Sequence, residues 1–242
     1  MKLGSHIKIV IQVLDIFFES RAPFDIILAK FFRNSRTGAH DRREIADFSY
    51  SIFRNFEKLK FLTKNITANF ARFYVLAHLK TQLAMSREKI AEIFSGERYC
   101  PEKLSNFEMK FLDSVDKKNN FPENALLNYP EWMTPLLQKS FDSHEMINEM
   151  SALNEKAFVD LRVNTLKASR DEVKKMLEAF QPEDCHYAVN GLRLLNGRIS
   201  RNHDVIAKGF AEIQDEGSQL VAEVCAVAPD NTVVDFCAGA GG

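Results

Sequence analysis

The spacing of apolar residues changes once along the chain, and this change constrains the fold more than any other feature. Over roughly the first 150 residues, apolar side chains recur every three to four positions, which is the spacing of one helix face. In the segment FVDLRVNTLK they alternate instead, at Leu161, Val163 and Thr165, which is the spacing of a strand. The sequence therefore predicts an all-α domain followed by a smaller unit that contains strands.

Five amphipathic helices are expected in the first hundred or so residues. Their apolar stripes occupy residues 7–18, 26–32, 45–59, 70–83 and 86–94. Pro23 suits the first turn of the second helix, Asp41 is a candidate cap for the third and Ser86 for the fifth. A polar, asparagine-rich linker follows near residue 116. Helices then return, one of them capped by Ser143, and Trp132 is expected to anchor the packing between domains.

Composition excludes several classes of protein. The chain has 242 residues, 45% of them hydrophobic, so it can bury a sizeable core. Its formal net charge of −1 means that any nucleic-acid contact must come from local patches. The four cysteines form no C-x-x-C pair, which predicts reduced thiols, no metal site and a cytoplasmic location. No apolar run is long enough for a membrane span.

The loop RNSRTGAHDRR places Arg33, Arg36, Arg42 and Arg43 close together around one glycine. Guanidinium groups match phosphate oxygens in a two-pronged geometry, so this loop is a candidate RNA-binding segment. A solvated loop is an equal alternative, because arginine clusters of this size are common. Arg43 can also pair locally with an acid such as Glu44.

A small α+β unit is expected after the helices. The first strand, around Leu161, is followed by a helix that Ser169 and Glu172 open in capping-box spacing. Asn190-Gly191 and Asn196-Gly197 are typical of hairpin turns. Such a sheet is a common platform for single-stranded RNA if aromatic residues lie on its face. Arg162 and Asn164, the polar groups of its first strand, would contact RNA or face water.

The chain closes on a glycine-rich turn after an apolar stretch. Asp215 is expected to cap a helix through Val227, and residues 233–236 are expected to form a short buried strand. Glycines after a strand let a ligand approach the backbone at the carboxyl end of a sheet, where α/β folds bind ligands. Dinucleotides and S-adenosylmethionine both fit this logic, and the spacing of the glycines does not separate them.

Four segments, in their order, resemble one family. YPEWMTPLLQKSF, DLRVNTLK, EIQDEGSQLVAEV and VVDFCAGAGG are similar to motifs of the bacterial RsmB/Sun (Nol1/Nop/Sun) rRNA cytosine carbon-5 methyltransferases. The resemblance implies a multidomain chain: a NusB-like helical RNA-binding domain over 1–128, linker helices with an α+β subdomain similar to RNA-recognition modules over 129–210, and the start of a Rossmann-like methyltransferase domain over 211–242.

The resemblance also implies a cofactor and a substrate. The cofactor is S-adenosylmethionine, the substrate is small-subunit (16S) rRNA, and the chain is expected to be a monomer. The cofactor segment would comprise Cys237, Ala238, Gly239, Ala240, Gly241 and Gly242. The family usually has C-A-A-P-G-G-K-T here, so Gly239 and Ala240 replace the commoner Ala-Pro.

The residues expected to perform catalysis do not occur in this sequence. The family's two cysteines lie in D-A-P-C-S and T-C-S motifs, and none of the four cysteines here has either context. The chain is therefore expected to be a truncated methyltransferase that is inert as given, because carbon 5 of cytosine needs activation by a thiolate. A noncatalytic NusB-like RNA-binding module and an unrelated nucleotide-binding enzyme are the two alternatives.

Overall fold

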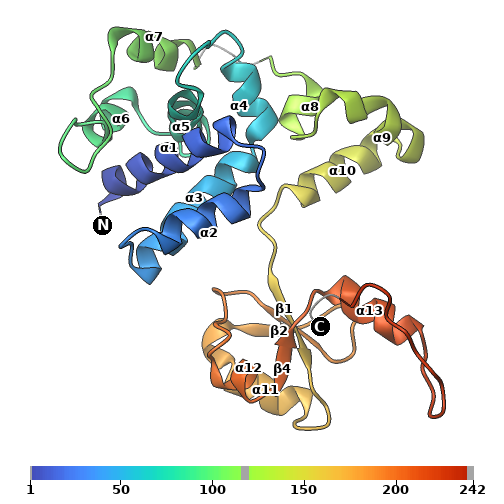
Figure 1. Cartoon of the computed structure of the whole chain (residues 1–242). Helices are drawn as coiled ribbons and strands as arrows, with labels where there is room; N and C mark the ends of the chain where they lie inside the picture. Colours follow the sequence, from blue (N-terminus) through green and yellow to red (C-terminus); the bar gives the residue numbers. More distant parts are fainter. Residues whose placement is uncertain (1, 116–119, 239–242) are drawn as a thin grey trace. The chain divides into compact units, whose positions relative to one another are not determined.

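The computed structural model describes residues 2–115 and 120–238, which form two compact units (Figure 1). The helical unit comprises the described residues up to Glu155, and the sheet unit comprises those from Lys156 to Ala238. The first strand begins at Val159, where the apolar spacing changes. The expected order, helices first and a strand-containing unit second, is confirmed.

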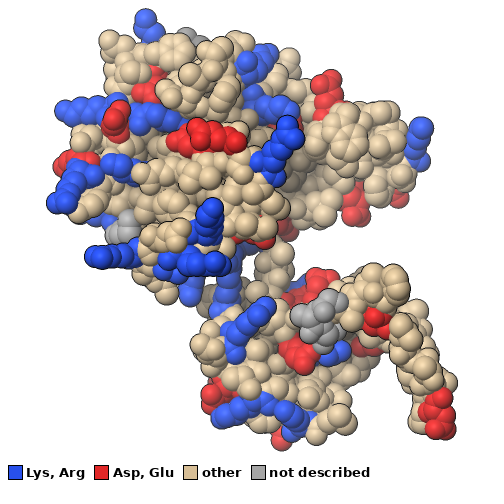
Figure 2. Space-filling model, in the orientation of Figure 1, with Lys and Arg blue, Asp and Glu red and all other residues tan. Residues whose placement is uncertain are grey.

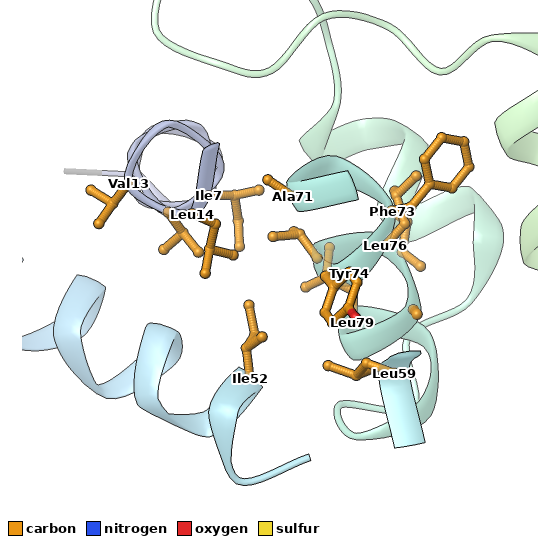
Figure 3. Close-up of a cluster of buried hydrophobic side chains, with 14 of the residues drawn as sticks. Ile7, Val13, Leu14, Ile52, Leu59, Ala71, Phe73, Tyr74, Leu76 and Leu79 are labelled. Carbon is orange, nitrogen blue, oxygen red and sulfur yellow. The ribbon is translucent and has the colours of Figure 1, made fainter. Parts of the chain in front are cut away.

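The main body of the helical unit packs around one central helix. The helices are α1 (Leu3–Glu19), α2 (Phe24–Arg33), α3 (Ala39–Phe53), α4 (Phe56–Leu62), α5 (Phe70–Thr81), α6 (Arg87–Ile93) and α7 (Asn106–Val115). α5 is buried along most of its length, and its Leu76 belongs to the same hydrophobic core as Leu14 of α1 and Ile52 of α3 (Figure 3). These three side chains are fully buried, so the apolar stripes seen in the sequence face one another.

Two details of these helices differ from expectation. Asp41 does not cap α3, because the helix begins at Ala39 and Asp41 lies in its first turn, where Oδ1 is 2.7 Å from Nε2 of His6. The stripe over residues 45–59 is broken at Arg54, so it forms α3 and α4 rather than one helix. Ser86 does cap α6, since its hydroxyl accepts a hydrogen bond from the Lys89 amide.

Four shorter segments complete the helical unit. They are α8 (Glu123–Leu126), the 3₁₀ turn η1 (Glu131–Met133), α9 (Thr134–Ser140) and α10 (Ser143–Leu153). The cap of α10 is Asp142 rather than Ser143, because Asp142 accepts hydrogen bonds from the His144 and Glu145 amides. Trp132 is 68% exposed on η1 and packs into no core of the helical unit.

An amide network joins these segments to the main body. Asn128, which has a left-handed backbone with φ 55°, accepts a hydrogen bond from the Glu57 amide and donates to the carbonyl of Phe53 and to Oδ1 of Asn154. Asn154 in turn donates to the carbonyls of Leu127 and Met150. The start of α4 and the end of α10 are thereby tied to the same two side chains.

The sheet unit has a βαββαβ order. Its elements are β1 (Val159–Val163), α11 (Arg170–Met176), η2 (Glu178–Phe180), β2 (Pro182–Asp184), β3 (Gly191–Leu194), α12 (Asp204–Ala207), β4 (Ala211–Ile213) and α13 (Glu216–Val224). The strands are antiparallel in the order β2-β3-β1-β4, with Leu161 opposite both Leu192 and Ile213. This is the split βαβ arrangement of ferredoxin-like folds.

Strand alternation gives the sheet one apolar and one charged face. Leu161, Val163, Leu192 and Leu194 are buried in one core with Val173 of α11. The intervening residues on the other face are charged: Asp160 and Arg162 of β1, Arg193 of β3 and Glu212 of β4. None of these four strand residues is aromatic, although the exposed ring of Phe158, just before β1, lies 5.6 Å from the Arg193 guanidinium. The aromatic strand residues that the sequence analysis made a condition for RNA binding are therefore not among them.

The turns of the sheet unit differ from the expected hairpins. The turn predicted at Asn190-Gly191 is one residue earlier, since the Gly191 amide donates to the Ala188 carbonyl and Gly191 already belongs to β3. A loop over residues 185–190 therefore connects β2 to β3. Gly197, with φ 78°, follows the end of β3 but opens no second hairpin. The predicted capping box of Ser169 and Glu172 is confirmed.

The segment assigned to the beginning of a methyltransferase domain is only partly as expected. Asp215 caps α13 as predicted, but the helix ends at Val224 rather than Val227. β4 pairs with β1, so residues 211–213 complete the sheet instead of opening the next domain. The strand expected at 233–236 is absent from the described residues, and Phe236 is 96% exposed. A lone strand has no hydrogen-bonding partner, which explains the difference.

Candidate nucleic-acid interface

The arginine-rich segment between α2 and α3 presents three of its four predicted arginines to solvent. Arg33 lies in the last turn of α2, Arg36 in the loop and Arg43 near the start of α3, and all three are exposed. Arg42 is half-buried, and its Nε donates to the Thr37 carbonyl at 2.7 Å. Arg42 therefore fixes the shape of the loop that carries the other arginines.

These exposed arginines create a local positive patch on a chain of nearly neutral charge. Figure 2 shows basic side chains along the edge of the helical unit where α2 ends and α3 begins. Within the described residues, no ion pair engages Arg33, Arg36 or Arg43, so the local pairing considered for Arg43 is not formed. Three guanidinium groups without carboxylate partners can bind phosphate oxygens.

Arg162 and Asn164 are placed differently from the loop arginines. Arg162 donates to the carboxylate of Glu212 across the strand pair at 2.9 Å. Asn164 donates to the Gly209 carbonyl and accepts from the Leu166 amide, which closes a turn after β1. Both side chains are thus held by the protein itself. The structure brings them together at the edge of one hollow, on the charged face of the sheet.

That hollow has a volume of 420 Å³ and lies between the end of β1 and α13. Its polar lining comes from Arg162, Asn164, Thr165, Asn190, Glu212, Gln219 and Glu223. Ligand sites have volumes of about 300–1,000 Å³, so the hollow is large enough for a small planar group. The sequence alone could not predict this hollow, because its walls come from segments that are far apart in the chain: residues 162–166, Asn190, Glu212 and helix α13.

A buried charge cluster attaches α13 to the same face. Asp160, which is 6% exposed, accepts two hydrogen bonds from Arg193 at 2.8 Å, and these bonds hold the pKa of Asp160 below its usual value. Arg193 also donates to Glu216 at 3.2 Å. Hydrogen bonds from the backbone amides of Tyr187 and Ala188 lower the pKa of Glu216.

The same cluster includes three groups that could ligate a metal. The ligand atoms of Asp160, Cys185 and Glu216 lie within 4.8 Å of one another. Arg193, however, is bonded to both carboxylates and supplies the positive charge that they need. Burial raises the pKa of the Cys185 thiol to about 11, so the thiolate that a metal requires is scarce at neutral pH. The cluster is therefore suited to holding α13 on the sheet.

One exposed aromatic loop was missed by sequence reasoning. Tyr187 is 68% exposed on the loop between β2 and β3, with its ring 4.4 Å from that of His186. Buried Glu216 holds the backbone of this loop. The sequence analysis predicted only a turn at Asn190-Gly191 here and assigned no role to Tyr187, an aromatic side chain that the loop presents to solvent. Such a side chain can stack on an unpaired base.

The predicted cofactor segment is described only in part. Gly239, Ala240, Gly241 and Gly242 lie outside the described residues. Cys237 and Ala238 are exposed, and the Cys237 amide donates to Oδ1 of Asp235 in a short turn. Cys225, expected in a helix core, is exposed at the end of α13. Of the predicted cofactor segment, the described residues therefore include only Cys237 and Ala238.

Comparison with known proteins finds partial matches to rRNA methyltransferases. Residues 129–199 match the family model described as "Methyltr_RsmF/B-like, ferredoxin-like domain", in agreement with the βαββαβ sheet. A probable ribosomal RNA small subunit methyltransferase B of Bacillus subtilis is 34% identical over 119 residues, and one of Synechocystis is 31% identical over 119 residues. Residues 129–199 of this chain are thus similar to the ferredoxin-like domain of RsmF/B-like methyltransferases.

The similarity to each family member is partial in length. Both matches cover 48% of this chain and 26% of the relative, so the chain spans about a quarter of the length of the curated relatives it matches. The ribosomal RNA small subunit methyltransferase B of Pseudomonas putida is 30% identical over 116 residues. The crystal structure of PH0851 superposes on 93% of this chain and 56% of its own, with a TM-score of 0.54 and 19% identity, which shows a shared fold.

Proposed function

We propose that this chain is the RNA-binding part of an rRNA methyltransferase that transfers a methyl group from S-adenosylmethionine to carbon 5 of a cytosine in small-subunit rRNA. The observation that carries the proposal is the match of residues 129–199 to the RsmF/B-like ferredoxin-like domain. The relatives named ribosomal RNA small subunit methyltransferase B support the reaction and the substrate. Because the proposed substrate is rRNA, we also propose a cytoplasmic location.

In this proposal the helical unit supplies most of the phosphate contacts. Arg33, Arg36 and Arg43 are exposed, lie on one edge and have no carboxylate partner among the described residues. Each phosphate contact releases condensed counterions from the RNA, so binding must weaken as the salt concentration rises. Arg162 and Asn164 have a smaller part, because their side chains are already hydrogen-bonded within the protein.

The proposed cofactor segment is Cys237 to Gly242, and none of the four cysteines has the D-A-P-C-S or T-C-S context expected for the covalent step. Cysteine must be a thiolate to add to carbon 6 of cytosine. The Cys185 thiol is buried with a pKa raised to about 11, and Cys100 is half-buried against Gly4 of α1. We therefore expect residues 1–242 to bind rRNA without methylating it. Transfer of labelled methyl groups to the transcript by this chain alone would contradict that expectation.

The binding test compares two sets of three substitutions with the same change in charge. Affinity for a small-subunit rRNA transcript is measured by fluorescence anisotropy over a range of salt concentrations. The set Arg33→Gln, Arg36→Gln and Arg43→Gln should reduce the slope of log K against log salt by about 2–3. The control set Lys89→Gln, Lys110→Gln and Lys139→Gln, all exposed in the helical unit, should change it little. Equal losses in both sets would show that the loop is not the interface.

The alternative of a noncatalytic NusB-like RNA-binding module predicts the same binding. The two proposals differ in the activity that they predict for a longer chain, one that includes the family's cysteine motifs. Methylcytosine formed by such a chain on small-subunit rRNA supports the methyltransferase, whereas binding without methylation supports the module.

A further inference from the structure

A second hollow of 470 Å³, the α2 hollow, lies beside the arginine-rich loop of the helical unit. Most of its lining is apolar and comes from Ile16 of α1, Ala22 of the following turn, and Ile26, Ile27 and Phe31 of α2. Ile16 is 43% exposed and Ile26 is 56% exposed, so part of this apolar surface is open to solvent. Ligand sites have volumes of about 300–1,000 Å³ and are mostly apolar with a few polar groups, which is the character of this hollow.

Four polar residues complete the lining of the α2 hollow. The hydroxyls of Ser20 and Ser35 are hydrogen-bonded to nearby parts of the chain. The side chains of Lys30 and Asn34, one turn apart at the end of α2, have no hydrogen bond or ion pair among the described residues. They offer an ammonium group, an amide N–H donor and an amide oxygen acceptor. Both kinds of hydrogen-bonding group are therefore available to a ligand.

The charges around α2 differ between its two ends. The C-terminal end and the loop after it carry Lys30, Arg33 and Arg36, none of which has a carboxylate partner among the residues that the structure describes. The opposite end, where α1 leads into α2, carries Asp15, Glu19, Arg21 and Asp25. α2 has ten residues and is about 15 Å long, so Asp25 in its first turn lies far from the arginines. A polyanion is thus attracted to the loop end of the hollow.

We propose that the α2 hollow binds one unpaired nucleobase of the RNA whose phosphates bind the loop arginines. This inference rests on the proposed function, because it requires that the arginine-rich loop bind RNA. Residues 34 and 35 line the hollow and lie between Arg33 and Arg36 in the chain, so a nucleotide with its phosphate on this loop has its base within reach of the hollow. The ring of Phe31 can stack on that base, and Lys30 can bond its edge.

An unpaired nucleotide fits this position better than an apolar segment of another protein. It carries an anionic phosphate and a planar base on one sugar. The phosphate matches the cations at the loop end, and the base matches the apolar lining. An apolar protein segment would fill the hollow and leave these cations without anions. A base inside a double helix is stacked and paired, so the RNA must be single-stranded at this point.

The test uses the full chain and two single-stranded oligomers of equal length, an oligocytidylate and an oligomer of abasic ribose phosphates. Because both carry the same number of phosphates, their difference in affinity reports the bases. Fluorescence anisotropy should show that oligocytidylate binds about ten-fold more tightly, as expected for one stacked base. Phe31→Leu keeps an apolar side chain but removes the ring, so it should reduce this preference by at least about three-fold and leave binding of the abasic oligomer unchanged. Phe61→Leu, the same change at a half-buried phenylalanine of α4, should preserve the preference.

A second variant leaves Phe31 and the arginines unchanged. Asn34→Leu fills the loop end of the hollow from an exposed position and should also reduce the preference. Equal affinity of the unmodified chain for both oligomers, with a steep salt dependence, would overturn the base site and leave the proposed function intact. A preference that survives both variants, or that Phe61→Leu lowers equally, would also overturn the base site. Absence of any RNA binding would reject the proposed function as well.

Discussion

Helices α1 and α13 have similar amphipathic sequences and different surroundings. In α1, Ile7, Val10 and Leu14 are all 0% exposed because α3 and α5 cover them. In α13, Val221 is 69% exposed and Val224 is 83% exposed. The pattern of apolar residues thus predicts which face of a helix can be buried. Burial itself depends on a partner, and the described residues provide none for this face of α13.

The two helices are consequently held by different forces. α1 is fixed by apolar packing, which contributes about 1.5–3 kcal/mol for each fully buried large side chain. α13 is fixed at its first turn by polar contacts: Glu216 accepts from the amides of Tyr187 and Ala188 and from Arg193. The first arrangement gives stability, and the second gives a defined position.

The largest effect is expected in the α1 core. Leu14→Ala removes a fully buried side chain and leaves a cavity, so it should lower the free energy of unfolding of the helical unit by about 3 kcal/mol. Hydrogen exchange followed by mass spectrometry should show faster exchange in α1, α3 and α5. Unchanged protection in these helices would mean that the core is not organised around this contact.

Acidification should destabilise the same unit by a similar amount. Burial, with a smaller contribution from Arg54, lowers the pKa of His78 from 6.5 to about 4. The unfolded chain therefore binds a proton between pH 6.5 and 4 that the native chain does not, and stability falls as pH falls through this range, by about 3 kcal/mol. Urea unfolding at several pH values measures the loss. His78→Leu should flatten the profile, and an unaltered profile in this variant would assign the loss to other groups.

A smaller effect is expected at the polar attachment of α13. Arg193→Met leaves buried Asp160 without its cation and should destabilise the sheet unit by about 2 kcal/mol, less than a fully buried pair because Arg193 is partly exposed. Arg162→Met, which breaks the exposed pair with Glu212, is the matched control and should cost at most about 1 kcal/mol. Equal losses of protection in β1 for the two variants would contradict this distinction.

The smallest effect is expected on the uncovered face of α13. Val224→Ala should change the free energy of unfolding by less than about 0.5 kcal/mol, because the side chain is already in water. A loss comparable to that of Leu14→Ala, measured under the same conditions, would show that this face is covered in solution and would remove the contrast with α1.

Periodic and local features of the fold were predictable from the sequence. The stripes of α1 and α5, the alternation of β1 and the capping box of Ser169 and Glu172 each depend on residues within one element. Features that join distant segments were not predictable. The pairing of β4 with β1 brings together residues about fifty positions apart, and short strands carry too few residues to specify a partner.

In the candidate site, too, local features were predictable and contacts between distant segments were not. The exposed arginines of the loop were found because they are neighbours in the sequence, and their exposure agrees with the expectation. Arg162 was found, but its pairing with Glu212 was not. The sequence did not single out Gln219 or Tyr187, because one glutamine in a helix or one tyrosine in a loop forms no pattern. Only the fold shows that Gln219 lines the hollow of the sheet unit and that the Tyr187 amide is bonded to Glu216.

The amide network of Asn128 bears on how this protein can be divided into independently folding pieces. A fragment ending at residue 128, the boundary expected from the sequence, would separate Asn128 from Asn154 and leave the Leu127 carbonyl without its Asn154 donor. A fragment ending at Glu155 keeps the network whole, and its end lies in an exposed segment before β1. Limited proteolysis should cleave the chain near Glu155, and the two units should be prepared as separate fragments with this boundary.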